Sequence, residues 1–210
     1  MGSVFKEFPA LLEELGIEPL HIVHVGAHQG EEMPFYAEAG ANHVTLVEPL
    51  PALAESLRGR FPEATVVEAA CGRVEGIAAL HVTARTNTST LLDPTGLDKV
   101  VDVIQVPVKR LMDIQGDANI AVIDAQGLEV EVLRAAYMDR FDLVIVETCT
   151  VDDPTIAAPH DATVAFMEDM GFRVANIWSR DYDWIARWAR GRNVTGYQGK
   201  VNDVAFVKAG

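Results

Sequence analysis

The sequence predicts an α/β protein with one mostly parallel sheet that is covered by helices on both faces. Short, continuously apolar segments such as HIVHVG (21–26) and NIAVIDAQG (119–127) alternate with segments whose apolar residues recur at helical spacing. Strands that are apolar at every position are typical of parallel sheets, because helices cover both faces. The 210 residues suit one domain with a substantial core. In such sheets the ligand binds at the carboxyl ends of the strands.

The expected elements follow one another along the chain. The opening helix begins near residue 5 and ends near Gly16, because glycine often stops a helix. Strands are expected at 21–26, 43–49, 64–72, 119–127, 141–149, 172–178 and 202–210. Further helices are expected at 31–40, 51–61, 128–137 and 163–171. Between the third and fourth strands, residues 76–92 alternate and are rich in β-branched side chains, which indicates extended or hairpin structure that 103–114 continues.

The charge of the chain narrows the classes of partner. Seventeen Lys and Arg against thirty-one Asp and Glu give a formal net charge of −14, which opposes binding to nucleic acid and to anionic membranes. No segment approaches the roughly 18 uninterrupted apolar residues of a membrane span, and the first residues lack a signal-peptide core. The two cysteines, Cys71 and Cys149, form no CxxC motif, so we expect reduced thiols. These observations predict a cytoplasmic protein with no nucleic-acid and no membrane partner.

The turn after the first strand, VGAHQGEE, indicates a nucleotide site. Gly26 and Gly30 are four positions apart, but His28 and Glu31 occupy positions at which the dinucleotide fingerprint has glycine. The amino terminus of a helix attracts anions, and here Glu31 and Glu32 already place negative charge there. They disfavour a pyrophosphate and favour a nucleoside ligand with a positive centre, as in S-adenosylmethionine. A tight connection with no ligand explains the glycines equally well.

The second strand ends in Glu48, eighteen positions after Gly30. A carboxylate about 20 residues beyond the glycine turn accepts hydrogen bonds from ribose hydroxyls in nucleotide-binding sheets. The same residue is also compatible with an ordinary solvated strand end. Together with the glycine turn, its position favours ribose binding.

Several motifs resemble, in order, those of the FkbM family of methyltransferases. They are VHVGAHQG, VTLVEPLPALAESLRGRF, TNTSTLL, VIDAQGLEVEVLRAA, FDLVIVET and NDVAFV, and they run from about Ile22 to Val207. The resemblance implies a Rossmann-like class I methyltransferase fold, with a single doubly wound seven-stranded sheet whose last strand is antiparallel. It also implies S-adenosylmethionine as cofactor and methyl transfer to a hydroxyl of a small natural product or sugar. We therefore expect an N-terminal helix at 1–20 and a methyltransferase domain at 21–210.

The resemblance also implies which residues bind the cofactor. Gly26, Ala27 and His28 correspond to the cofactor turn, and Glu48 corresponds to the ribose ligand. The remaining expected cofactor residues are Ala70 and Cys71 beside the adenine, Ser89 in the polar stretch with Thr88, and Asp124 and Gln126 in the D-x-Q-G-x-E signature. Three positions depart from the family, and at two of them His24 replaces its usual Asp and Val122 replaces a common Lys. His28 also stands where the family commonly has Asn.

Methyl transfer to a hydroxyl requires a base within hydrogen-bond reach of the acceptor. Asp124, at the end of the fourth strand, is the first candidate for this base or for a ligand at the methyl end. Glu129 is a second candidate, although it equally suits a first-turn residue that favours the helix dipole. His160, in the loop after the fifth strand, is a third, since histidine titrates near neutral pH; an exposed loop histidine is the plainer interpretation. We expect no metal site, because no carboxylate or cysteine completes a ligand set around the histidines.

The late segment 178–200 is aromatic and locally basic. Trp178, Trp184, Trp188 and Tyr197 are compatible with an acceptor pocket, while the four-residue spacing of Trp184 and Trp188 favours simple packing on the sheet. Two other functions remain alternatives to methyl transfer: a protein that binds S-adenosylmethionine without catalysis, and a Rossmann oxidoreductase of the NAD type. The sequence predicts neither the acceptor nor the oligomeric state.

Overall fold

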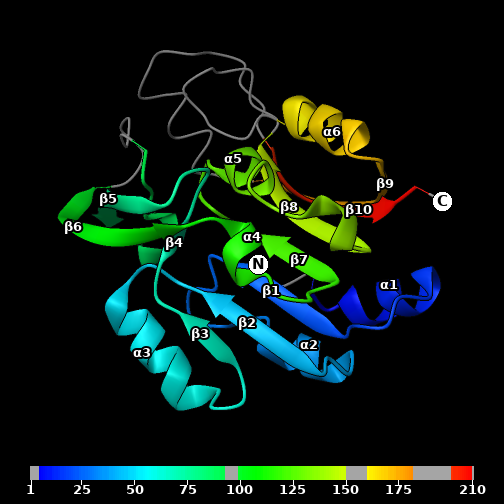
Figure 1. Ribbon diagram of the computed structural model, residues 1–210, viewed down its shortest axis with the longest axis horizontal. Coiled ribbons are helices and arrows are strands. Elements are labelled where there is room, and N and C mark those ends of the chain that lie inside the picture. The colour runs from blue at the N-terminus through cyan, green and yellow to red at the C-terminus, as the bar shows by residue number, and fades with distance from the viewer. Residues whose placement is uncertain (1–4, 93–98, 150–159, 182–199, 210) are drawn as a thin grey trace.

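Seven strands form the central sheet of the computed structural model, which describes residues 5–92, 99–149, 160–181 and 200–209 (Figure 1). The strands are β1 (His21–Val25), β2 (His43–Val47), β3 (Thr65–Val67), β7 (Ile120–Ile123), β8 (Leu143–Cys149), β9 (Phe172–Asp181) and β10 (Lys200–Lys208). Their order across the sheet is β3-β2-β1-β7-β8-β10-β9. β10 is antiparallel to both of its neighbours, and the other pairs are parallel. The predicted α/β fold, a mostly parallel sheet whose last strand is antiparallel, is confirmed.

Helices cover both faces of this sheet (Figure 1). The helices of one face are α1 (Phe8–Leu15), α2 (Met33–Glu38) and α3 (Pro51–Arg60), and those of the other are α4 (Leu111–Ile114), α5 (Glu129–Leu133) and α6 (His160–Asp169). The strands serve both faces, because successive side chains point to opposite sides. In β7, Ile120 and Val122 pack with the first group, whereas Ala121 and Ile123 pack with the second. This two-sided burial explains why the strands are apolar at every position.

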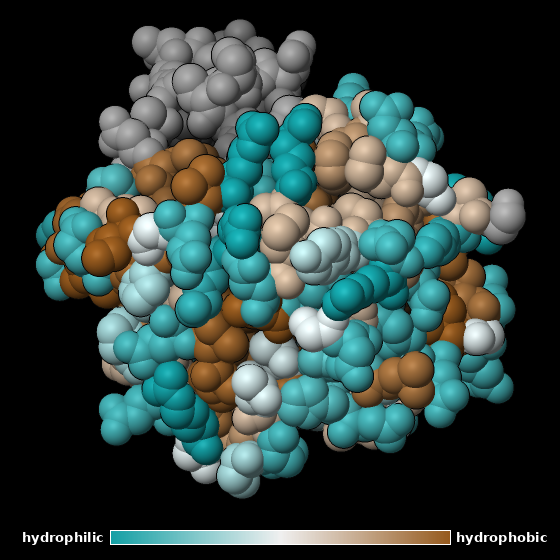
Figure 2. Space-filling view, viewed as in Figure 1, coloured by the Kyte–Doolittle hydropathy of each residue, from teal (hydrophilic) through white to brown (hydrophobic). Residues whose placement is uncertain are grey.

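A second, three-stranded sheet lies beside the carboxyl ends of β1 and β2 (Figure 1). It consists of β4 (Ala70–Cys71), β6 (Val100–Lys109) and β5 (Gly76–Thr83), and β5 is followed by the 3-10 turn η1 (Thr86–Thr88). Its inner face packs Leu80, Val106 and Val108 against Leu50. On its outer face apolar side chains are open to solvent, such as Ile77, which is 76% exposed. Hydrophobic side chains, in brown, lie on the surface at the left of Figure 2, where Figure 1 places this hairpin. The expected hairpin is therefore present, and it forms one wall of the site described below.

Several expected boundaries are wrong. The single strand expected at 64–72 is two strands. β3 pairs with β2 as far as Val67, and the chain then turns so that Ala70 of β4 pairs with Val108 of β6. Residues 111–114 form the helix α4 where extended structure was expected. The helix expected at 31–40 covers only Met33–Glu38, and the helix expected at 128–137 covers only Glu129–Leu133.

The first helix is part of the same body as the sheet. Phe8, Leu11 and Leu12 of α1 are buried in one cluster with Ile22 of β1 and Tyr36 of α2. Among the described residues, no helix combines the length and the apolar character that crossing a bilayer requires.

Candidate functional site

Four carboxylates lie at one level across the carboxyl-terminal edge of the sheet. Glu48 and Asp124 directly follow the last paired residues of β2 and β7, and Glu147 of β8 pairs with Asp203 of β10. The β7–β8 register places Asp124 next to Glu147, since the preceding residues of the two strands are partners. Glu48, Asp124, Glu147 and Asp203 are called the carboxylate row below. Gly26 follows β1 and interrupts the row between Glu48 and Asp124.

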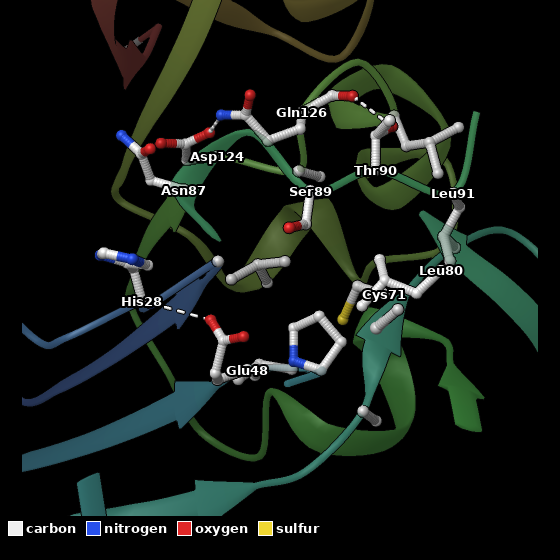
Figure 3. Close-up of a pocket in the computed structure, with 18 of the residues that line it drawn as sticks. His28, Glu48, Cys71, Leu80, Asn87, Ser89, Thr90, Leu91, Asp124 and Gln126 are labelled. Atoms are coloured by element: carbon white, nitrogen blue, oxygen red, sulfur yellow. Dashed lines mark hydrogen bonds between the residues drawn. The ribbon is translucent and has the colours of Figure 1, made fainter. Parts of the chain in front are cut away.

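Gly26 occupies this gap because no other residue fits there. Its φ is +80°, in the left-handed region, and a Cβ atom at this position would lie 1.9 Å from the carbonyl oxygen of Asp124. His28 also adopts a left-handed backbone, with φ +45°, and this conformation lets its N–H donate to Glu48 Oε2 at 2.9 Å (Figure 3). The glycine turn therefore leaves an open space above β1 and ties itself to the end of β2.

A pocket opens above this turn, with about 610 Å³ of empty space that includes its open mouth (Figure 3). Eight of the nine residues expected to bind the cofactor line it: Gly26, His28, Glu48, Ala70, Cys71, Ser89, Asp124 and Gln126. Ala27 does not, because its side chain is buried in the core on the helix side of the turn. The pocket thus collects residues from four strand ends and from the hairpin into one place.

Glu48 is a carboxylate with one backbone donor on each oxygen. Oε2 accepts from His28 N–H, and Oε1 accepts from Leu50 N–H at 2.8 Å. Burial raises the pKa of Glu48, while these two N–H groups act in the opposite direction. Each oxygen keeps a second lone pair, so Glu48 is able to accept bonds from two ligand hydroxyls.

Asp124 is a buried carboxyl whose neighbours are mostly other carboxyls. Burial, its largest cause, and the charge of Glu129 raise the pKa of Asp124 to about 7, and the charge of Asp203 adds to this rise. The Gln126 amide donates to Asp124 Oδ1 and also, at 3.3 Å, to Glu147 Oε2. Asp124 therefore exchanges a proton near neutral pH, as a general base requires.

Glu129, the second candidate base, does not line the pocket. Its Oε1 accepts from the N–H groups of Ala125 and Gly127 and so closes the turn that carries Gln126, whose own φ is +47°. Burial raises the pKa of Glu129 to about 7. The structure places this residue beneath the turn rather than against the open space.

His160, the third candidate, is the first residue of α6 and does not line the pocket. Its Nδ1 lies 3.1 Å from Thr148 Oγ1, in a hydrogen bond to the residue after Glu147. The aromatic side chains of Trp184, Trp188 and Tyr197 lie outside the described residues. Trp178 belongs to β9, where its indole N–H donates to Glu7.

The two glutamates after the glycine turn behave differently from each other. Glu31 accepts from the His28 ring and from Gln29 N–H. Glu32 is buried, and burial raises its pKa to about 7. α2 begins at Met33 with Glu32 as its N-cap residue, so the two glutamates lie at the amino terminus of the helix, just before its first turn. The charge that disfavours a pyrophosphate belongs chiefly to Glu31.

The hairpin supplies lining residues that the sequence did not single out. Thr86, Asn87, Thr90 and Leu91 close one side of the pocket, together with Ser89. His28 Nε2 bonds Thr86 Oγ1 at 2.8 Å, and Thr90 Oγ1 donates to the carbonyl of Gln126 at 2.9 Å. The segment 86–91 is thus tied at one end to the glycine turn and at the other to the turn after β7. The motif TNTSTLL was the available signal, but the partners of its hydroxyls are far away in sequence.

The pattern of the family described as "Methyltransferase FkbM domain" matches residues 24–174, most of the chain. The chain belongs to the FkbM methyltransferase family. As a member it is a methyltransferase with S-adenosylmethionine as its cofactor, and the resemblance seen in the sequence is confirmed. No functionally curated protein matches the sequence.

Solved structures show the same fold as this FkbM methyltransferase at low identity. An FkbM methyltransferase from Methylobacillus flagellatus is 12% identical with a TM-score of 0.52, over 89% of this chain and 44% of that one. A Geobacter sulfurreducens methyltransferase in complex with S-adenosyl-L-homocysteine is 10% identical with a TM-score of 0.55, over 99% and 91%. A Pyrococcus horikoshii protein described as an RNA methyltransferase is 13% identical with a TM-score of 0.56, over 99% and 83%. These likenesses establish the class I methyltransferase fold.

Two of the three departures from the FkbM pattern are neighbours. His24 of β1 and Val122 of β7 are register partners, and both are buried away from the pocket. Burial lowers the pKa of His24 to about 4, so this ring is neutral, and its Nδ1 bonds the Tyr36 hydroxyl at 3.1 Å. An apolar residue at 122 therefore suits an uncharged histidine beside it, and neither position removes a side chain from the pocket wall.

Proposed function

We propose that this FkbM methyltransferase transfers a methyl group to a hydroxyl oxygen of a small molecule, a natural product or a sugar. The observation that carries the proposal is Asp124, a buried carboxyl with a pKa of about 7 that lines the pocket. S-adenosylmethionine supplies a methyl group already activated by the sulfonium, so the protein has to hold the acceptor in line and remove its proton. Asp124 is the proposed base.

The pocket suits S-adenosylmethionine in charge. Of the described residues that line it, none is Lys or Arg, and Glu48 and Asp124 are acidic. Such walls favour the sulfonium and ammonium groups and disfavour the pyrophosphate of a dinucleotide, which argues against an oxidoreductase of the NAD type.

Each wall has a proposed part in holding the cofactor. Glu48 accepts from the ribose hydroxyls, and the turn at Gly26 and His28 passes close to the cofactor. Ala70 and Cys71 contact the adenine; burial raises the pKa of the Cys71 thiol to about 12, so it stays protonated and acts as an apolar contact. Ser89 and Gln126 border the methyl end.

The acceptor is proposed to be small and not nucleic acid, because the net charge of −14 opposes a phosphate backbone. A hydroxyl acceptor is favoured because its deprotonation needs a base, and the pocket offers one. A protein that binds the cofactor without catalysis would have no need of a proton-accepting carboxyl in the pocket wall, where Asp124 lies.

Calorimetry with S-adenosylmethionine and S-adenosylhomocysteine tests the cofactor site. Replacing Glu48 by Ala should weaken binding by about 10- to 100-fold, because hydrogen bonds to a charged group are lost. Glu55→Ala, an exposed glutamate on α3, is the matched control and should bind as the wild type does. Equal affinity in the Glu48 variant would contradict the assignment.

A labelled-methyl assay over a panel of sugar and polyketide hydroxyls tests the reaction. We expect transfer to at least one hydroxyl and a loss of about 100-fold or more in Asp124→Asn. Cofactor binding with no transfer to any member of the panel would favour the non-catalytic alternative.

A further inference from the structure

The carboxyl groups of Asp124 and Glu147 form a pair at the ends of the neighbouring strands β7 and β8. One amide bridges them: Gln126 Nε2 donates to Asp124 Oδ1 at 2.5 Å and to Glu147 Oε2 at 3.3 Å. Gln126 is fixed for this task, because its carbonyl accepts from Thr90 and Glu129 closes the turn around it. The fixed position of Gln126 therefore holds the two carboxyl groups next to each other.

The two carboxyl groups are also close enough to hydrogen-bond to each other, an interaction that opposes the rise in the pKa of Asp124. An ionised carboxylate only accepts hydrogen bonds, so one of the two must carry a proton to donate to the other. The geometry thus corresponds to a pair that shares one proton, as two carboxyls at close range do.

The groups around the pair all disfavour a second negative charge. Glu129 of α5 and Asp203 of β10 both raise the pKa of Asp124, and Glu147 in turn raises the pKa of Glu129. From β1 the neighbour is Gly26, and from the hairpin Asn87 and Ser89 border the same pocket without charge. Among the described residues that line the pocket, no cation of the protein compensates the pair.

We propose that Asp124 and Glu147 hold one proton between them in the free enzyme and release it when S-adenosylmethionine binds, which leaves Asp124 ready as the base. The inference rests on the proposed function, since it assigns the pair to the same site. A positive charge brought into the pocket beside Asp124 favours the fully ionised form of the pair, and Glu147, which does not line the pocket, feels it through Asp124. Glu147 is in this scheme a positioning residue that acts through Asp124.

The pair also gives the methyl transfer a place for its proton. The acceptor oxygen forms its bond to the methyl carbon as the carbon–sulfur bond breaks, and the electron pair of that bond stays on sulfur. The acceptor proton passes to Asp124, which then donates a hydrogen bond to Glu147 and restores the shared-proton state. Relief of the repulsion between two neighbouring charges favours this step.

The test is the number of protons released when S-adenosylmethionine binds, measured by calorimetry at pH 7 in buffers of different ionisation enthalpy. Wild type should release on the order of half a proton per cofactor, because a carboxyl with a pKa of about 7 is half protonated there. S-adenosylhomocysteine, which lacks the sulfonium charge, should release less. The measurement needs only the free enzyme and the two ligands, with no acceptor.

Variants of the two carboxyl residues show whether the released proton comes from the pair. Glu147→Gln should reduce the release, because a glutamine amide neither shares a proton with Asp124 nor repels its charge; burial, Glu129 and Asp203 still favour protonated Asp124, so the release does not fall to zero. Asp124→Asn should also reduce it, because the proposed base is gone. Glu131→Gln, the same change on the exposed side of α5, is the matched control and should behave as wild type. Unchanged melting temperatures establish that each variant is folded, and the wild-type comparison of the two ligands stands without any variant.

The outcomes separate the two proposals. Binding of S-adenosylmethionine without proton release, or equal release in wild type and Glu147→Gln, would overturn the shared-proton pair and leave the proposed function intact. The absence of any binding heat with either ligand would overturn the cofactor site itself.

Discussion

Glu48 and Asp124 are two buried carboxyls at the ends of strands in one pocket, and their surroundings give them opposite characters. Glu48 is 4% exposed and Asp124 is 8% exposed, so burial alone does not separate them. Glu48 has a backbone N–H on each oxygen, whereas Asp124 has Gln126 on one oxygen and carboxyls around it. The first suits a fixed acceptor of hydrogen bonds, and the second suits an exchanger of protons.

Two other carboxyls refine this comparison. Glu129 accepts two backbone N–H groups, but both donate to Oε1, while Oε2 is buried with no hydrogen-bond partner among the described residues. Glu32 is buried and its Oε1 likewise has no such partner there. Both have pKa values raised to about 7. The comparison teaches that a buried carboxylate stays a fixed ligand only where each oxygen has its own donor.

The largest effect is expected from adding a side chain at Gly26, which separates Glu48 from the other three residues of the carboxylate row. Gly26→Ala would force a Cβ to 1.9 Å from the Asp124 carbonyl oxygen and strain a backbone with φ +80°. We expect a loss of at least about 3 kcal/mol in the free energy of unfolding, together with loss of cofactor binding. Denaturant melts and calorimetry measure the two effects.

Gly40→Ala is the control for backbone strain alone, since Gly40 has φ +81° but a Cβ added there would meet no atom within 4 Å. It should cost only about 1 to 2 kcal/mol and leave binding unchanged. Equal losses in the two variants would mean that the close approach of Gly26 to Asp124 is unimportant.

The second effect is a pH dependence of the free energy of unfolding. It comes from buried carboxyls such as Glu32, of which one oxygen has no hydrogen-bond partner among the described residues. The folded-state pKa of Glu32 is raised from 4.5 to about 7, so its contribution to stability is fully present below about pH 4.5 and is lost as the pH rises through about 7. At about 1.4 kcal/mol per pH unit this rise corresponds to roughly 3 kcal/mol at most. Wild type should thus become less stable between about pH 4.5 and pH 7.

Glu32→Gln removes this titration. The variant should be more stable than wild type above about pH 7 and similar to it at acid pH, in urea melts across that range. Glu38→Gln, at an exposed glutamate of α2, should follow the wild-type curve. A pH dependence that survives unchanged in Glu32→Gln would show that Glu32 is ionised in the folded protein.

Much of this site was predictable from the sequence, because its main parts are local. The glycine turn follows an apolar strand, Glu48 ends the next strand, and Asp124 and Gln126 lie in one short motif. The rule that ligands bind at the carboxyl ends of parallel strands then brings these parts together. Ala70, Cys71 and Ser89, which also line the pocket, were expected only from the resemblance to the FkbM family.

The rest was not predictable, because it depends on partners distant in sequence. Thr86 meets the His28 ring across 58 positions, and Thr90 meets Gln126 across 36. The burial of Glu32 and the placing of Glu129 under a turn are likewise set by packing, so their charges were misjudged from their places near helix starts. The division of 64–72 between two sheets follows from pairing with β6, which no local pattern reveals.

The third effect compares Glu48 and Asp124 when each carboxyl group is replaced by an amide. Glu48→Gln should weaken binding of S-adenosylmethionine about tenfold, because an amide group must face one of the two N–H donors. Asp124→Asn should cost less near pH 6, where Asp124 is mostly protonated, and more near about pH 8.5, where it is ionised. Calorimetry at both pH values tests this, with Glu131→Gln as control. A loss in Asp124→Asn that is the same at both would contradict the proton-exchanging role.

The smallest effect concerns the segment 86–91, which contacts the turn beside Glu48 at one end and the turn beside Asp124 at the other. Thr86→Val removes the bond to the His28 ring on the Glu48 side, and Thr90→Val removes the bond to Gln126 on the Asp124 side. Each should speed dissociation of S-adenosylhomocysteine by several-fold, up to about tenfold, since one neutral hydrogen bond is worth about 1 kcal/mol. Stopped-flow fluorescence measures the rate. Thr65→Val, which breaks an exposed Thr65–His43 bond outside the pocket, is the matched control. If only Thr90→Val speeds dissociation, the bond to Gln126 holds the segment in place and the bond to His28 does not. Equal effects would mean that both bonds hold it.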